Sequence, residues 1–146
     1  MEIFSSAFNN EQPIPIKYTC DGLDISPPLE IKDVPKKTKS LALIVVDPDA
    51  PLGEWTHWLV WNINPKIGFI EEGIVPEGAT EGLNSFKKHS YGGPCPPSGI
   101  HHYYFKIFAL DKELDLEPYS IKEEVLKSME DHILDSAEIM GIYHRE

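Results

Sequence analysis

Arginine is nearly absent from this chain: Arg145 is the only one, and lysine supplies the other basic residues. A phosphate clamp built from forked guanidinium groups is therefore excluded. Acidic residues outnumber basic ones by 24 to 13, so the formal net charge is −11. Nucleic acids and anionic membranes attract proteins through basic patches, so we expect neither as a partner. A site for a small anion would have to use backbone amides, histidine, lysine or hydroxyl groups as donors.

Long apolar runs are also missing. None reaches the roughly 18 residues of a membrane-spanning helix. Residues 1–10 hold neither the basic stretch nor the apolar segment of a signal peptide. We therefore expect a cytoplasmic protein without stable membrane insertion. The 146 residues fit a single domain, 1–146, that buries a hydrophobic core of its own.

Cysteine occurs only twice, as Cys20 and Cys95, which excludes a disulfide framework. In a reducing cytosol both side chains are expected to be thiols. The chain is, however, rich in lysine and glutamate and poor in glutamine, a bias typical of thermophilic proteins. With such an origin a bridge between the two cysteines becomes an alternative, and the sequence leaves this choice open.

Clustered prolines, 13 in all, divide the chain into short segments. Three of the segments between them, residues 41–46, 57–63 and 103–110, are apolar on both faces and rich in β-branched or aromatic residues, which predicts buried strands. No amphipathic helices alternate with them, so a parallel sheet of βαβ units is not expected. Antiparallel sheets packed as a sandwich fit better, because both faces of such strands need cover.

The C-terminal third predicts one helix. Ser120 and Glu123 have the spacing of a capping box. Apolar residues then recur at helical spacing up to Leu134. Residues 137–143 are predicted to form a short closing strand. The fold class expected from these patterns is mainly β, with one or two short helices toward the C-terminus.

Residues 84–99 form a segment without periodicity that is rich in glycine and proline. Structureless loops longer than about 12–15 residues are uncommon in compact domains and are often functional. The prolines indicate a stiff loop rather than a floppy one.

Two clusters of polar residues flank the predicted strands. Asp47 and Asp49 directly follow the first predicted strand, in a segment that also contains two prolines, and His57 is the first residue of the second strand. Taken alone, the acids fit an ordinary turn, and a single histidine fits a core position. A carboxylate that accepts from one nitrogen of His57 would leave the other nitrogen free for a ligand.

A third cluster lies at the end of the long loop. Gly92, Gly93 and Cys95 are the residues whose backbone amides are available to an anion there. His102 and Tyr104 are two residues apart, so they share one face of a strand. The alternative is a tight turn followed by a solvated strand start.

Other chemistries fit the sequence less well. Two histidines and a carboxylate suffice for iron or zinc, but the spacings of known metal motifs are missing. Cys95 paired with His57 or His102 is conceivable as a nucleophile, although its place between prolines favours a structural role. No serine-hydrolase elbow is present.

Taken together and in this order, the motifs resemble the phosphatidylethanolamine-binding protein family, which includes the Raf kinase inhibitor proteins. The resemblance runs through nearly the whole chain, in its short bacterial and archaeal branch. It is carried by Asp21-Gly22, by Ser26-Pro27-Pro28-Leu29, by DPDAP at residues 47–51, by HWLV at 57–60, by YGGPCPPSG at 91–99 and by HYY at 102–104.

The resemblance implies an antiparallel β-sandwich with a small pocket for phosphate-like or carboxylate anions. It assigns to the pocket Asp47, Asp49, Pro51, His57, Gly93, Pro96, His102 and Tyr104, with the amide of Cys95, and it places Trp55 near the rim. In this assignment Tyr103 stands where the family usually has an arginine between the histidine and the tyrosine.

We therefore expect a non-enzymatic anion-binding module without metal or cofactor. The ligand class is phosphate, a phosphorylated head group such as phosphoethanolamine, or a carboxylate. In the expected site Asp47 or Asp49 orients His57, and His102 lies across the pocket. The alternative is a protein-interaction role as an inhibitor of a protease or kinase, and hydrolysis at a His/Asp site ranks last. The sequence leaves open whether the protein forms a homodimer.

Overall fold

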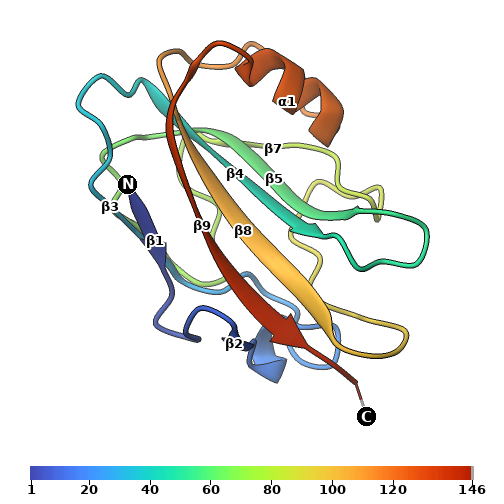
Figure 1. The fold of residues 1–146 in the computed structure, drawn as a ribbon. Coiled ribbons are helices and arrows are strands. Elements are labelled where there is room, and N and C mark those ends of the chain that lie inside the picture. The colour runs from blue at the N-terminus through green and yellow to red at the C-terminus, as the bar shows by residue number, and fades with distance from the viewer. Residues whose placement is uncertain (146) are drawn as a thin grey trace.

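Two β-sheets form the framework of the computed structural model, which describes residues 1–145 (Figure 1). The larger sheet has the order β2-β9-β8-β4-β5-β7 and the smaller one the order β1-β3-β6. The strands are β1 (Glu2–Phe4), β2 (Gln12–Pro13), β3 (Leu29–Lys32), β4 (Ser40–Asp47), β5 (Trp55–Ile63), β6 (Phe69–Ile70), β7 (Thr80–Glu81), β8 (His101–Leu110) and β9 (Ile133–Tyr143). Neighbouring strands are antiparallel except β2 and β9, which pair in parallel.

The expected mainly β fold and its three buried strands are confirmed. Strand β4 is buried at every position, and its side chains alternate between two hydrophobic clusters. Leu43 belongs to the cluster between the two sheets. Its neighbour Ile44 belongs to the cluster under the C-terminal helix. Both faces of the central strands are covered, which explains why their sequences are apolar throughout.

The helix α1 spans Lys122–Met129, and a 3-10 turn, η1, spans Ile16–Tyr18. The helix begins one residue later than the capping pattern predicted. Glu124, not Glu123, accepts a hydrogen bond from the backbone N–H of Ile121 at 3.1 Å. The helix ends at Met129 and not at Leu134, to which the helical spacing had extended. Ile133 and Leu134 belong to β9 instead.

Strand β8 alternates regularly between the two faces of the large sheet. His101, Tyr103 and Phe105 are buried, whereas His102 and Tyr104 are more exposed. Because side chains two residues apart share a face, this alternation decides which members of the third cluster face the interior of the sandwich.

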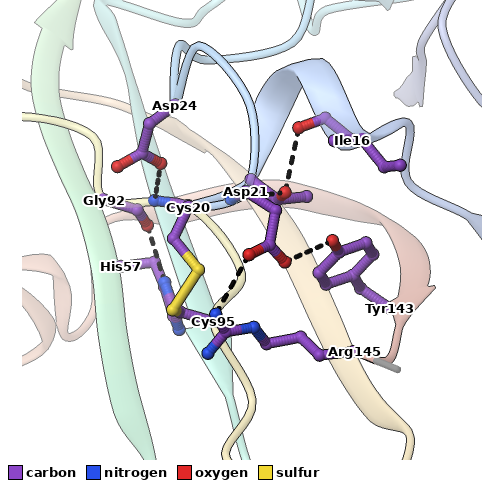
Figure 2. The surroundings of a disulfide bond; sticks show 11 residues. Ile16, Cys20, Asp21, Asp24, His57, Gly92, Cys95, Tyr143 and Arg145 are labelled. Carbon is purple, nitrogen blue, oxygen red and sulfur yellow. Dashed lines mark hydrogen bonds and ion pairs between the residues drawn. A yellow bond between two sulfur atoms is a disulfide. The ribbon is translucent and has the colours of Figure 1, made fainter.

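A disulfide joins Cys20 to Cys95 across 75 positions of the chain. The bond lies where the segment after η1 meets the long loop, next to a backbone hydrogen bond from Cys20 N–H to the carbonyl of Pro94. Figure 2 shows it beside His57 and Gly92. Of the two alternatives for the cysteines, the structure has the bridge.

Candidate functional site

A cavity of about 200 Å³ lies where β4 ends and where β5 and β8 begin. Prolines and aromatic rings make up much of its wall, and two histidines and one carboxyl group contribute polar atoms. The lining residues are Asp47, Ala50, Pro51, Trp55, His57, Phe86, Cys95, Pro96, Pro97, His101 and Tyr103. Segments far apart in the sequence thus meet around one concave spot.

His57 is buried beside the cavity and is held by the long loop. Its Nδ1 lies 2.6 Å from the carbonyl oxygen of Gly92, and the N–H of Gly92 donates back to the carbonyl of His57 at 3.0 Å. The rings of Phe86 and Tyr103 meet the imidazole edge-on, with centroids at 5.4 and 5.2 Å. Burial lowers the pKa of His57 below its ordinary value of 6.5.

The expectation that Asp47 or Asp49 orients His57 is therefore wrong. The long loop returns along the start of β5, so a backbone carbonyl occupies the position expected for a carboxylate.

Asp47 instead pairs with His101. Its Oδ2 lies 2.6 Å from Nδ1 of His101, and both side chains are almost fully buried. Its other oxygen, Oδ1, accepts the backbone N–H of Asp49 at 2.8 Å. The carboxylate is thus fixed at both oxygens, one of them on the imidazole that lines the cavity.

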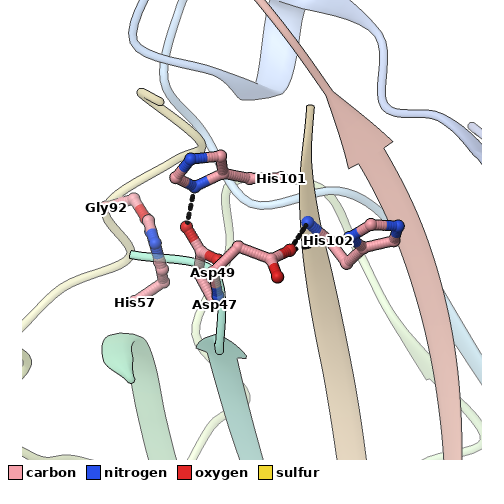
Figure 3. Close-up of polar contacts among 6 residues, drawn as sticks. All are labelled: Asp47, Asp49, His57, Gly92, His101 and His102. Atoms are coloured by element: carbon pink, nitrogen blue, oxygen red, sulfur yellow. Dashed lines mark hydrogen bonds and ion pairs between the residues drawn. The ribbon is translucent and has the colours of Figure 1, made fainter. Parts of the chain in front are cut away.

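His102 and Tyr104 do not line the cavity, which corrects the expected pocket set. His102 lies on the exposed side of β8, where its Nδ1 is 2.7 Å from Oδ2 of Asp49 (Figure 3). Tyr104 lies on the same face of the sheet as His102, away from the cavity, and packs against the cluster under α1. His101 and Tyr103 line the cavity. The position between the histidine and the tyrosine, where the family usually has an arginine, is therefore His102 and not Tyr103.

Asp49 is also outside the cavity. Its Oδ2 accepts both the side chain and the backbone N–H of His102. Burial acts to raise the pKa of this carboxyl, but the two hydrogen bonds from His102 outweigh it and lower the pKa below its ordinary value. Asp49 therefore braces the start of β8 from the outer side.

One signal in the sequence could have found the right pair. Lys106 is the only charged residue within the strand, and it belongs on the side away from the sandwich interior. Even-numbered residues of β8 share its face, so the odd-numbered His101 and Tyr103 face inward. The long run of apolar residues around Lys106 weakened this signal.

The hydroxyl of Tyr103 is buried and has no hydrogen-bond partner among residues 1–145. Tyr103 itself is 1% exposed and lines the cavity. Burial, reinforced by the nearby carboxylates of Asp47 and Asp49, raises its pKa, so the side chain stays a neutral phenol. The phenol can donate one hydrogen bond and accept others.

The glycine amides expected to bind an anion are engaged within the protein. The N–H of Gly93 donates to Oδ1 of Asp24 at 2.7 Å, and that of Gly92 donates to His57. A side chain at Gly93 would collide with Asp24 and with the backbone of Tyr18. Gly93 therefore permits close packing of the loop and does not line the cavity. Of the expected loop residues, Cys95 and Pro96 do line it.

Asn84 is a site residue that the sequence analysis missed. It is buried, and its amide Nδ2 donates to the carbonyls of Ser90, at 2.7 Å, and of His57, at 3.4 Å. Its Oδ1 accepts the N–H groups of Phe86 and Lys88. One side chain thus closes the turn that presses Phe86 against the cavity.

Within residues 1–145 no helix is long and apolar enough to cross a membrane. The same part of the chain holds no group of three or more His, Cys, Asp or Glu side chains that could bind a metal ion.

Comparisons with known proteins agree with this architecture. A family model described as phosphatidylethanolamine-binding protein matches residues 4–144. A protein of Methanothermobacter thermautotrophicus, named as a UPF0098 protein, is 49% identical over 150 residues, or 99% of each chain.

Solved structures are similar as well. A crystal structure described as a phosphatidylethanolamine-binding protein homologue of Chlamydia trachomatis matches with a TM-score of 0.96 and 44% identity, over 99% of this chain and 97% of the other. YbcL of E. coli, described as a member of the mammalian family, matches with a TM-score of 0.93 and 30% identity, over 99% and 98%.

Proposed function

This chain belongs to the phosphatidylethanolamine-binding protein family, and we propose that its cavity binds a small oxyanion without catalysing a reaction. The ligand class is phosphate, a phosphorylated head group or a carboxylate. The binding groups are the Tyr103 hydroxyl and the Nε2 atoms of His57 and His101.

The observation that carries this proposal is the buried hydroxyl of Tyr103. A buried polar group without a partner costs about 1–3 kcal/mol, and here the group borders a cavity. A ligand oxygen in that cavity would satisfy the hydroxyl. The cost of leaving it unpaired in the free protein is then recovered on binding.

The two imidazoles provide the second argument. Each is held at Nδ1 by the protein, His57 by a carbonyl and His101 by a carboxylate. The rings therefore have a fixed orientation, and Nε2 is the nitrogen left to meet a ligand. Apolar walls around these groups strengthen every hydrogen bond inside by lowering the local dielectric constant.

A non-catalytic role is supported by the state of Cys95. It is the lining residue best suited to act as a nucleophile, but its sulfur is bonded to Cys20. A thiolate is thus not available to form a covalent intermediate. The cavity of about 200 Å³ suits a small anion or head group better than a drug-sized substrate, which fills about 300–1,000 Å³.

Isothermal calorimetry with phosphate and with phosphoethanolamine tests the proposal. We expect weak binding, with Kd from about millimolar to high micromolar, because association entropy offsets a few hydrogen bonds. Tyr103→Phe keeps the ring and removes the hydroxyl, so it should weaken binding about tenfold. His102→Ala, on the exposed side of the same strand, is the matched control and should bind normally. Equal Kd values for Tyr103→Phe and the wild type would contradict this site.

A further inference from the structure

The two halves of the disulfide differ in their access to the cavity. Cys95 is exposed and lines the cavity, whereas Cys20 is half-buried and does not line it. A nucleophile that enters the cavity therefore meets Cys95 before Cys20. Exposed disulfides exchange with thiols more readily than buried ones, because a thiolate has to reach one of the two sulfur atoms.

The loop up to Pro94 is held by hydrogen bonds that do not depend on the bridge. Cys20 donates its N–H to the carbonyl of Pro94 at 3.1 Å, and Gly93 donates its N–H to Oδ1 of Asp24 at 2.7 Å. Opening the bridge therefore leaves the two cysteines close together and frees only Cys95, in the cavity wall. A small disulfide can then re-form the bond, so the exchange is reversible.

Cys95 also lies next to the groups proposed to bind the oxyanion. Figure 2 shows it beside His57, and the ring of Tyr103 meets that of His57 with centroids 5.2 Å apart. All three residues line the same cavity of about 200 Å³. An anion held by Tyr103 and His57 would therefore occupy the space through which a thiol approaches Cys95.

We propose that Cys95 is a site of thiol–disulfide exchange for small thiols, that they reach it through the cavity, and that a bound oxyanion blocks this route. The blocking step rests on the proposed function. The bridge is then a cavity-wall bond whose reduction depends on whether the cavity is occupied.

The exchange has two balanced steps. A thiolate attacks Sγ of Cys95, the bond between the two sulfur atoms breaks, and its electron pair leaves on Sγ of Cys20, which takes a proton from solvent. A second thiolate then attacks the sulfur of the bound thiol and releases Cys95 as a thiolate. The protein disulfide is reduced to two cysteines, and two small thiols are oxidised to one small disulfide.

A monothiol identifies the sulfur that is attacked, because it stays on the protein as a mixed disulfide. Wild-type protein is treated briefly with 2-mercaptoethanol, quenched with excess N-ethylmaleimide and digested for mass spectrometry. We expect the mercaptoethanol adduct on Cys95 and the maleimide on Cys20, about fivefold or more over the reverse arrangement. Equal amounts, an excess of adduct on Cys20, or a bridge that stays closed until the protein unfolds would each overturn the inference.

The rate of the same reaction tests the blocking step. Phosphate at about ten times its calorimetric Kd leaves about one cavity in eleven empty, so the exchange should slow about tenfold. Sodium chloride at the same ionic strength gives the reference rate. An unchanged rate in protein that binds phosphate overturns the inference and leaves the proposed function intact. Absence of phosphate binding in the calorimeter overturns both, because the inference requires an occupied cavity.

Two single-cysteine variants separate a blocked route from a general gain in stability. Cys20→Ser leaves the thiol of Cys95, and Cys95→Ser leaves that of Cys20. Phosphate at about ten times each variant's own Kd should slow alkylation of Cys95 by iodoacetamide about tenfold, and that of Cys20 less than about twofold. Equal protection of both thiols contradicts the cavity route. If either variant does not fold, the adduct position and the rate in the wild type decide.

Discussion

At the residue scale, the chemistry of the site depends on the hydrogen-bond partner of each side chain more than on which residues are present. His57 was correctly predicted in the cavity, but its partner is the carbonyl of Gly92 rather than a carboxylate. This difference changes the chemistry, because a carbonyl does not add the charge that would favour a protonated ring. The imidazole of His57 is therefore favoured in its neutral form.

The buried, neutral state of His57 predicts how stability depends on pH. The pKa of its imidazole is lowered in the folded protein, so the unfolded chain binds more protons below pH 6.5. Stability should therefore fall as pH decreases through and below 6.5, above the range where carboxyl groups with ordinary values of 3.8 to 4.5 titrate. Thermal unfolding midpoints across this range measure the effect.

His57→Asn serves as the comparison, because it retains an N–H for Gly92 and does not titrate. Its midpoint should vary less with pH between about 5 and 7 than that of the wild type. A steeper dependence in the variant would be inconsistent with a neutral buried His57.

Asn84 is the second prediction at this scale. Its side chain makes four hydrogen bonds that hold the turn behind Phe86. Asn84→Ala leaves those backbone groups unpaired and should lower the free energy of unfolding by about 2–4 kcal/mol. Chemical denaturation measures this, with the exposed Asn64→Ala as control. A loss no larger than in the control would show that water replaces these bonds.

At the element scale, the position of strand β8 was predicted correctly, but the face on which its residues lie was not. Its position and its buried character were predicted correctly, and it begins two residues earlier than expected, at His101. Both faces of the strand pack against apolar clusters, so its sequence pattern indicates only weakly which face points into the sandwich. A shift of one residue exchanged His101 and Tyr103 for His102 and Tyr104.

The disulfide ties the loop that forms one wall of the cavity to the N-terminal segment. Breaking it releases a closed loop of about 75 residues in the unfolded chain, for which chain entropy predicts a loss of about 4 kcal/mol. Cys20→Ala/Cys95→Ala should unfold at a lower temperature and bind phosphate more weakly, because Cys95 is no longer anchored. Calorimetric melting and titration measure both effects.

Reductant provides the control for this prediction. A dithiol should lower the melting temperature of the wild type toward that of the double variant and leave the double variant unchanged. A wild-type midpoint that does not respond under conditions where free thiols are detected would contradict a stabilising role for the bridge.

At the scale of the whole molecule, charge is the dominant property. With a net charge of −11, acidic side chains outnumber basic ones, and the excess carboxylates repel one another in the folded protein. Sodium chloride at about 0.5 M should therefore raise the unfolding midpoint by a few degrees, because it shortens the range of this repulsion. Chloride is the suitable salt, since phosphate belongs to the ligand class proposed for the cavity. A midpoint that falls would mean that screened ion pairs outweigh the repulsion.

The overall architecture is that of the family, and the expectation of a β-sandwich is confirmed by the structure and its relatives. Oxyanion binding, the alternative role as a protease or kinase inhibitor, and a homodimer remain predictions. They concern partners, and each requires its own binding measurement.

Local patterns were enough to predict the buried strands and the long loop, and short motifs carried the resemblance to the family. These features depend on residues close together in the chain or on simple composition. Three contacts could be settled only in the folded molecule: Gly92 with His57, Asp47 with His101 and Cys20 with Cys95. Each joins residues 35 to 75 positions apart. Such contacts depend on strand register and loop path, which local patterns do not specify when both faces of a strand are apolar.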